Sequence, residues 1–151
     1  MRLSDLLTPT RIRVPLHATD KAGVLRELVD LAGAGNGVPS DEVLGAILER
    51  EKQFPTGIGY SVSVPHGKTP VLGALVIVAG TTPAPVPYET IDGEPVRLFF
   101  LLAGPESAAG AHVKALSRIS RLVRREPVRA RLLSARTPEE FYRVVCEAEV
   151  P

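Results

Sequence analysis

Two almost unbroken apolar runs in the chain constrain its fold more than any other feature. They cover Leu75 to Ala79 and Val96 to Leu102. Strands that bury only one face alternate apolar and polar residues, whereas strands covered on both faces form continuous apolar runs. Both runs are far shorter than the roughly 20 residues that span a bilayer. The sequence therefore predicts central strands of a sheet with helices on either side.

Helical periodicity surrounds these runs, with apolar residues spaced three and four positions apart. The mixture of strands and helices predicts a three-layer α/β/α sandwich with a mixed central sheet. We expect Ser40 to cap the second helix, Thr137 to begin a capping box, and the proline-rich Thr82 to Pro87 to form a surface connection. The expected strands are Arg11 to Leu16, Tyr60 to Val64, Leu75 to Ala79 and Val96 to Leu102, and the expected helices are Asp20 to Ala32, one after Pro39, one from Ser107 through Val123, Pro127 to Leu133 and Pro138 to Glu147.

Length and composition are those of an ordinary single domain. The 151 residues, 44% hydrophobic and 23% charged, can form one core, so we expect a single domain over residues 1–151. The formal charge of +1 does not favour nucleic acid or an anionic membrane, and the lone Cys146 excludes a disulfide framework. The N-terminus lacks a signal-peptide core. We therefore expect a cytoplasmic protein without direct membrane insertion.

Three further patterns indicate no site of their own. The arginines between Arg118 and Arg136 lack interleaved aromatic residues, so we interpret them as a solvated helix face. The glycine-rich residues 33–37 follow a helix instead of joining a strand to a helix, which favours a helix end and loop over a phosphate loop. The three histidines lack metal-ligand spacing, so no metal site is expected, although His66 and His112 could meet and hold adventitious zinc.

One of the three histidines ends a strand-like run within residues 56–68. Apolar residues alternate with serines there, Pro65 is expected to end the hydrogen-bond ladder, and Gly67 allows backbone to approach whatever His66 holds. A neutral imidazole has one ring nitrogen whose lone pair can attack phosphorus. The alternative is a histidine that only closes the strand and bonds to the backbone.

Three other segments lie before and after the histidine segment along the chain. Ala46 to Lys52 precedes the histidine segment, Ile91 to Val96 leads into the second apolar run, and His112 to Ile119 begins a helix. Together with residues 56–68, these segments resemble the enzyme IIA domains of the fructose/mannitol and nitrogen-regulatory type, from the phosphoenolpyruvate-dependent sugar phosphotransferase system. The resemblance spans the chain from about Leu3 to Val145 and favours a phosphoacceptor role for His66.

The resemblance implies a phosphotransferase component that needs no cofactor. In that family Nε2 of the histidine accepts the phosphoryl group, which would leave the Nδ1–H of His66 to donate to a backbone carbonyl, expected within Pro65 to Lys68. The implied donor is a histidine-containing phosphocarrier protein. The implied acceptor is an enzyme IIB component or a regulated target protein.

Four residues are candidates to support the acceptor histidine. His112 is either a satisfied interior histidine or, beside His66, an Nε2–H donor to phosphate near a helix N-terminus. Arg50 either contacts the phosphoryl oxygens or remains solvated. Lys68 either supplies electrostatic support and partner docking or faces water, and Gly67 leaves room for close approach of the backbone.

Three functions remain open from the sequence. The leading hypothesis is a relay through His66 to an enzyme IIB component of a sugar phosphotransferase system. The alternative is a nitrogen-regulatory-type binding module whose partner contacts are switched by phosphorylation of His66. A degenerate scaffold without phosphorylation is disfavoured because both family histidines are present. The sequence departs from the family at Tyr60 and Ser61, where small residues, glycine or asparagine are common, and we expect Tyr60 in a rim or packing role.

Overall fold

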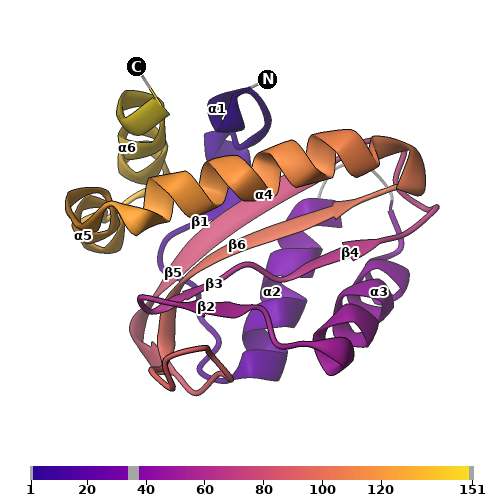
Figure 1. The fold of residues 1–151 in the computed structure, drawn as a ribbon, viewed down its shortest axis with the longest axis horizontal. Coiled ribbons are helices and arrows are strands. Elements are labelled where there is room, and N and C mark those ends of the chain that lie inside the picture. Colours follow the sequence, from indigo (N-terminus) through magenta and orange to yellow (C-terminus); the bar gives the residue numbers. More distant parts are fainter. Residues whose placement is uncertain (1, 34–37, 150–151) are drawn as a thin grey trace.

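A mixed sheet of six strands lies between two layers of helices in the computed structural model, which describes residues 2–33 and 38–149 (Figure 1). The strands are β1 (Ile12–Arg13), β2 (Gly57–Gly59), β3 (Val62–Ser63), β4 (His66–Lys68), β5 (Val76–Val86) and β6 (Val96–Gly104). Their order is β1-β5-β6-β3-β2, and β4 follows β3 along the same edge of β6. β5 and β6 are antiparallel, whereas β3 and β4 run parallel to β6.

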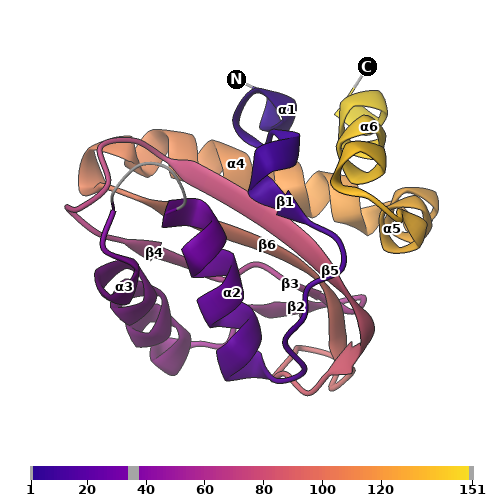
Figure 2. The same ribbon diagram turned by 180° about the vertical axis from the view of Figure 1, so that it is seen from behind.

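Helices cover both faces of this sheet, as the α/β/α prediction requires. On one face lie α1 (Leu3–Leu6), α4 (Ala109–Arg124), α5 (Glu126–Ser134) and α6 (Pro138–Glu149). On the other face lie α2 (Lys21–Gly33) and α3 (Ser40–Gln53), as Figure 2 shows from behind. The predicted three-layer sandwich with a mixed central sheet is confirmed.

The two central strands divide their side chains between two cores. Ile77 of β5 and Leu102 of β6 pack into the core under α4, α5 and α6, while Val78 and Leu101 pack into the core under α2 and α3. All four side chains are fully buried. Continuous apolar sequence in these strands therefore reflects burial on both faces, as predicted.

The expected strand from Tyr60 to Val64 is confirmed only at Val62–Ser63, which form β3. Tyr60 and Ser61 form the two-residue turn between β2 and β3, and both have left-handed backbone, with φ of 58° and 63°. Paired left-handed residues are the geometry that matches the twist of a tight hairpin, although glycine and asparagine adopt it more easily. The apolar–polar alternation in this segment therefore did not indicate one continuous strand.

Two other boundaries differ from the prediction for identifiable reasons. The proline-rich segment Thr82 to Pro87 is not a separate connection, because β5 continues to Val86 through an irregularity in its pairing with β6. Prolines lack the N–H that the ladder uses, and Pro83 and Pro85 lie exposed in the irregular part, while Pro87 lies exposed just after the strand. Ser40 is the first residue of α3 and makes no capping bond; Pro39 occupies the cap position.

The predicted capping box at Thr137 is only half present. The Thr137 hydroxyl accepts the N–H of Glu140 at 3.1 Å, but the Glu140 carboxylate accepts the N–H of Arg136 instead of that of Thr137. The first strand is shorter than expected and covers only Ile12–Arg13. The other expected helices lie within a few residues of their predicted bounds, and glycine-rich residues 34–37 lie outside the described residues.

Candidate functional site

His66 is the first residue of β4, at the edge of the sheet beside Leu102 of β6. Its Nδ1 lies 2.8 Å from the carbonyl oxygen of Val64. Because a carbonyl oxygen only accepts, Nδ1 carries the hydrogen and Nε2 keeps its lone pair. The expected bond to a backbone carbonyl is therefore present, but its acceptor precedes the Pro65 to Lys68 segment in which we expected it. Pro65 does not end the ladder either, because its carbonyl accepts the N–H of Leu102 at 3.0 Å.

His112 reaches the same place from the first turn of α4. Its side chain is 5% exposed, so it points inward as the helical spacing predicted. The rings of His66 and His112 meet edge to face, with centroids 5.3 Å apart and planes inclined by 70°. Two histidines from distant parts of the sequence thus share one site.

A pocket of about 340 Å³ opens over the two rings. All five site residues expected from the sequence line it, together with Leu116 of α4. We call it the histidine pocket. The residues that line it are Arg50, His66, Gly67, Lys68, His112 and Leu116.

Two cations sit on the wall of the histidine pocket. Arg50, near the end of α3, donates from Nη1 to the carbonyl of Phe54 at 2.9 Å, which orients the guanidinium and leaves its other N–H groups without a bond to any described residue. Lys68 Nζ lies 3.4 Å from a carboxylate oxygen of Glu106. Both cations are positioned to attract an anionic group to the histidines.

Gly67 also has a structural role that the sequence did not indicate. A methyl group at Gly67 would lie 3.0 Å from backbone atoms of Ala46 and Ile47, so the glycine allows β4 to pack directly on the α3 backbone. The close approach is therefore to a helix of the same chain. It matters for the site because Arg50 lies one turn beyond Ala46 on α3 and reaches the histidine pocket through this contact.

The surroundings of the two rings favour their neutral forms. Burial lowers the pKa of His66 below 6.5, the hydrogen bond to Val64 opposes this change, and the charges of Arg50 and Lys68 add to it. The pKa of His112 falls to about 4, first through burial and then through the proximity of His66 and Lys68. Both imidazoles are therefore uncharged at neutral pH, and His66 has a free electron pair at Nε2.

Glu51 was given no role from the sequence, and its charge raises the pKa of His66 against the effect of burial. The Glu51 carboxylate is buried and accepts two hydrogen bonds from Thr56, one from its N–H at 3.0 Å and one from its hydroxyl at 2.7 Å. The same carboxylate lies 3.2 Å from Lys21 Nζ. Burial raises the pKa of Glu51, but these hydrogen bonds and Lys21 outweigh it and lower the pKa overall. The Thr56 hydroxyl also contacts Ser63 and Tyr88. The only sequence signal for Glu51 was its position directly after Arg50 on a helix. A charged residue at that position could equally have been an exposed one.

Tyr60 lies outside the histidine pocket. Its ring is 55% exposed and packs against the guanidinium of Arg129 on α5, 4.5 Å from the ring centroid. Its N–H donates to Asp92 at 3.1 Å. The departure from the family pattern at Tyr60 therefore affects the turn between β2 and β3 and leaves the lining of the histidine pocket unchanged.

Two other kinds of site, a metal site and a membrane span, are without support among the described residues. No group of three or more histidine, cysteine or acidic residues among them could hold a metal ion. None of the helices in the described part of the chain is long and apolar enough to cross a membrane.

Comparison with known proteins agrees with the geometry. The family model for the phosphoenolpyruvate-dependent sugar phosphotransferase system, EIIA 2, matches residues 5–148. A nitrogen regulatory protein from Bradyrhizobium diazoefficiens is 37% identical over 145 residues, which make up 96% of this chain and 95% of that protein. The fructose-specific EIIABC component from Bacillus subtilis is 36% identical over 146 residues, 96% of this chain but 23% of that protein.

A solved structure extends the similarity to three dimensions. The crystal structure of the nitrogen regulatory protein IIA-Ntr from Neisseria meningitidis matches with a TM-score of 0.88 at 26% identity, covering 95% of this chain and 98% of that one. Sequence and fold thus agree over nearly the whole chain. The chain therefore belongs to the EIIA type 2 family of the phosphoenolpyruvate-dependent sugar phosphotransferase system, whose members carry phosphoryl groups in a phosphohistidine relay.

Proposed function

We propose that this chain is a regulatory phosphocarrier. His66 accepts a phosphoryl group from a histidine-containing phosphocarrier protein, and its phosphorylation switches contacts with a target protein. The observation that carries this proposal is the histidine pocket, in which a neutral His66 with an oriented ring faces His112 between two cations. Of the two functions expected from the sequence, the regulatory one has the better support, because the chain matches a nitrogen regulatory protein over 95% of that protein's length.

The acceptor step follows from the tautomer of His66. The Nε2 lone pair attacks the phosphorus of the donor phosphohistidine, the phosphorus–nitrogen bond of the donor breaks, and its electron pair returns to the donor ring. Nδ1–H remains bonded to Val64, which stabilises the charge that develops on the imidazole. In this proposal Arg50, Lys68 and an N–H of His112 hold the phosphoryl oxygens, which is supported by their position in the lining of the histidine pocket.

The switch follows from the surface around the histidine pocket. Phe54 follows α3 and its carbonyl binds Arg50, Val113 follows His112 on α4, and these two apolar residues are 71% and 65% exposed. Exposed apolar side chains beside a site favour a protein contact. A phosphoryl group adds a charge of about −1.5 to −2 next to them, which changes the affinity of such a contact.

A second candidate function is the relay to an enzyme IIB component in sugar uptake. The likeness to part of a fructose-specific EIIABC component favours it, because that protein's name joins A, B and C components. Both functions use the same acceptor step. They differ in what happens to the phosphoryl group afterwards.

The decisive experiment follows the phosphoryl group after it has been loaded. The protein is phosphorylated from phosphoenolpyruvate by enzyme I and the carrier protein, freed of both, and mixed with the fructose-type enzyme IIB of its own source. We expect the group to stay on this chain while a fructose-specific enzyme IIA loaded in the same way is discharged. Rapid and complete discharge of this chain would refute the regulatory proposal and establish the sugar relay.

The regulatory output has its own measurement. Target proteins captured from the source cells are identified and purified, and their affinities for the phosphorylated and unphosphorylated chain are compared. For wild type we expect the two affinities to differ by about tenfold or more, and for His66→Ala we expect no difference. The matched control His17→Ala, which removes an exposed histidine elsewhere, should show the wild-type difference in affinity. Equal affinities for both forms would contradict the switch. Phe54→Ser should weaken target binding and leave the loading of His66 intact.

A further inference from the structure

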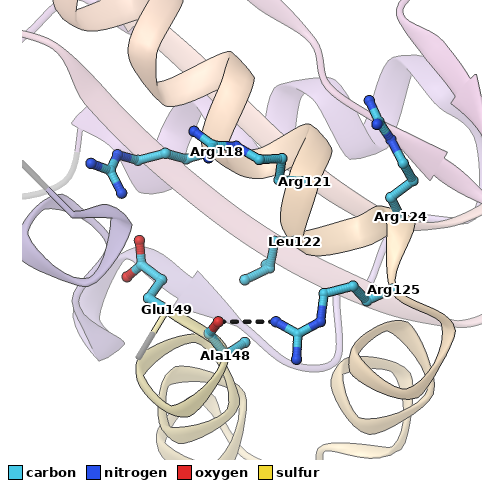
Figure 3. A pocket seen from close by; sticks show the side chains of 7 residues that line it. All are labelled: Arg118, Arg121, Leu122, Arg124, Arg125, Ala148 and Glu149. Carbon is cyan, nitrogen blue, oxygen red and sulfur yellow. Dashed lines mark hydrogen bonds between the residues drawn. The ribbon is translucent and has the colours of Figure 1, made fainter. Parts of the chain in front are cut away.

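A second pocket opens at the opposite end of α4 from His112. It has a volume of about 560 Å³ and shares no lining residue with the histidine pocket (Figure 3). The helical rise of about 1.5 Å per residue places Arg124 roughly 18 Å from His112 along α4. We call it the arginine pocket. The residues that line it are Arg118, Arg121, Leu122, Arg124, Arg125, Ala148 and Glu149.

Helical spacing brings three guanidinium groups to the arginine pocket. Arg118 and Arg121 are three positions apart, and Arg125 follows four positions later at the C-terminal end of α4. Their side chains therefore project from the same face of the helix. Figure 3 shows these three side chains around the hollow with Leu122 between them, whereas Arg124 extends away from the other three. The end of α6, at Ala148 and Glu149, forms the opposite wall.

The positive charge of the arginine pocket is only partly neutralised within the described chain, because four arginines and a single carboxylate, that of Glu149, line it. Arg118 and Arg121 make no side-chain hydrogen bond or ion pair with any of residues 2–33 and 38–149. Arg125 donates to the neutral carbonyl of Ala148 at 3.1 Å. The carboxylate of Glu149 accepts the N–H groups of Leu3 and Ser4 at 2.6 and 2.9 Å and makes no ion pair with a pocket arginine in the described chain, although its charge still offsets one of theirs. Like charges gathered in this way repel one another, and a bound anion relieves that repulsion.

We propose that the arginine pocket binds a small molecule that carries two or more phosphate groups. A guanidinium group presents two parallel N–H donors that match phosphate oxygens, and several such groups around one hollow match several phosphates. The volume falls within the range of about 300–1,000 Å³ that is typical of ligand pockets. Leu122 provides an apolar contact for the rest of the molecule.

This proposal differs from the solvated helix face that the sequence favoured. Spacing along α4 shows that the arginines share a face, but it cannot show that α6 closes the other side of that face. A nucleic acid would require a basic surface that follows many phosphates, whereas these arginines line a single hollow. A single hollow with three guanidinium groups suits a compact polyanion better.

Isothermal titration calorimetry with inorganic tripolyphosphate tests the arginine pocket directly. At about 0.15 M salt, where exposed charges are largely screened, we expect saturable one-to-one binding to wild type. The double variant Arg118→Gln/Arg121→Gln should weaken the dissociation constant about tenfold or more. The matched control Arg136→Gln/Arg143→Gln removes the same charge from exposed positions outside the pocket and should bind like wild type. Circular dichroism and intact-mass labelling of His66 verify that each variant folds and still accepts phosphate.

Further ligands identify the chemistry of the site. Citrate, a compact trianion without phosphate, should bind more weakly than tripolyphosphate. Comparing ADP with pyrophosphate shows whether the phosphate groups belong to a nucleotide or to an inorganic chain. The proposal is overturned if tripolyphosphate does not saturate the protein, if both double variants lose binding equally, or if an acidic peptide binds the same arginines more tightly.

Discussion

His66 and His112 meet edge to face, with ring centroids 5.3 Å apart, although one begins a strand at the edge of the sheet and the other lies in the first turn of α4. Burial and neighbouring charges lower the pKa of both rings, so both are neutral at pH 7. One ring can therefore act as a nucleophile while the other donates a hydrogen bond. This pairing is the basis of the first two predictions.

The low pKa of His112 predicts a loss of stability in mild acid. Its pKa is about 4 in the folded protein and 6.5 in the unfolded chain, so the unfolded chain binds the proton first as pH falls. The stability that the neutral His112 ring contributes to the folded protein is fully present above pH 6.5 and is lost as pH falls from 6.5 towards 4. The free energy of unfolding should therefore decrease by about 3 kcal/mol over this window from His112 alone.

Urea unfolding of wild type and His112→Gln at several pH values measures this effect. The variant should show a flatter dependence of the free energy of unfolding on pH between 6.5 and 4. His17→Gln, which removes an exposed histidine, serves as the control and should keep the wild-type dependence. Parallel curves for wild type and His112→Gln would show that the folded state does not suppress protonation of His112.

Arg50 is predicted to act on His66 through its charge. Burial is the largest cause of the low pKa of His66, and the Arg50 guanidinium lowers it further. Arg50→Gln should therefore raise the pKa of His66, as measured by titration of the ring protons in NMR spectra. The variant should also accept phosphoryl groups more slowly, by about 10- to 150-fold, because a charge-assisted contact to phosphate is worth about 1.5–3 kcal/mol. An unchanged pKa and an unchanged rate would place the Arg50 guanidinium outside the working site.

Gly67→Ala is predicted to separate β4 from α3. The added methyl group would lie 3.0 Å from backbone atoms at Ala46 and Ile47, which have no flexible end that can move aside. Overpacking of this kind destabilises by about 1–3 kcal/mol, and the shift should slow phosphoryl acceptance by displacing Arg50. Chemical denaturation and the rate of labelling measure the two effects.

Gly45→Ala on the same helix is the matched control for Gly67→Ala. A methyl group at Gly45 meets nothing within 4 Å, and alanine favours a helix over glycine by about 0.5–1 kcal/mol. This control should therefore be more stable than wild type and label at the wild-type rate. Similar behaviour of the two alanine variants would refute the close packing of β4 on α3.

Ser61→Gly is predicted to stabilise the β2–β3 hairpin. Ser61 has a φ of 63°, a left-handed conformation that costs about 1–2 kcal/mol for residues other than glycine. Relief of this strain, less the greater freedom of glycine in the unfolded chain, should raise the free energy of unfolding by about 0.5–1 kcal/mol. Ser117→Gly, inside α4, should lower it instead, since glycine disfavours a helix. A destabilised Ser61→Gly variant would contradict the strain at this turn.

Sequence patterns predicted the layers of this fold because each layer depends on local periodicity. The apolar runs gave β5 and β6, and the three-to-four spacing gave α2 to α6 within a few residues. The same spacing predicted that His112 points inward. The motif around His66 predicted that His66, Gly67 and Lys68 belong to one site, and all three line the histidine pocket. Family resemblance supplied the grouping of His66 with His112, since no periodicity relates residue 66 to residue 112.

Features set by contacts between distant segments were not predictable in this way. Alternation around Tyr60 fits a strand and a hairpin equally well, and only the pairing of β2 with β3 decides between them. The role of Gly67 depends on how closely α3 approaches, and that of Glu51 depends on Thr56 and Lys21 converging on one carboxylate. The arginine pocket likewise exists only because α6 returns beside α4.

The most direct test of the account is phosphoryl transfer from phosphoenolpyruvate through enzyme I and the carrier protein, followed by intact mass at neutral or alkaline pH. Wild type, His112→Ala and His17→Ala should gain about 80 Da, the mass of one phosphoryl group on the nucleophile. The gain should be labile in acid, slower to appear in His112→Ala and absent from His66→Ala. Failure of folded wild type to gain this mass from its own donor, or labelling that persists in His66→Ala, would contradict the account.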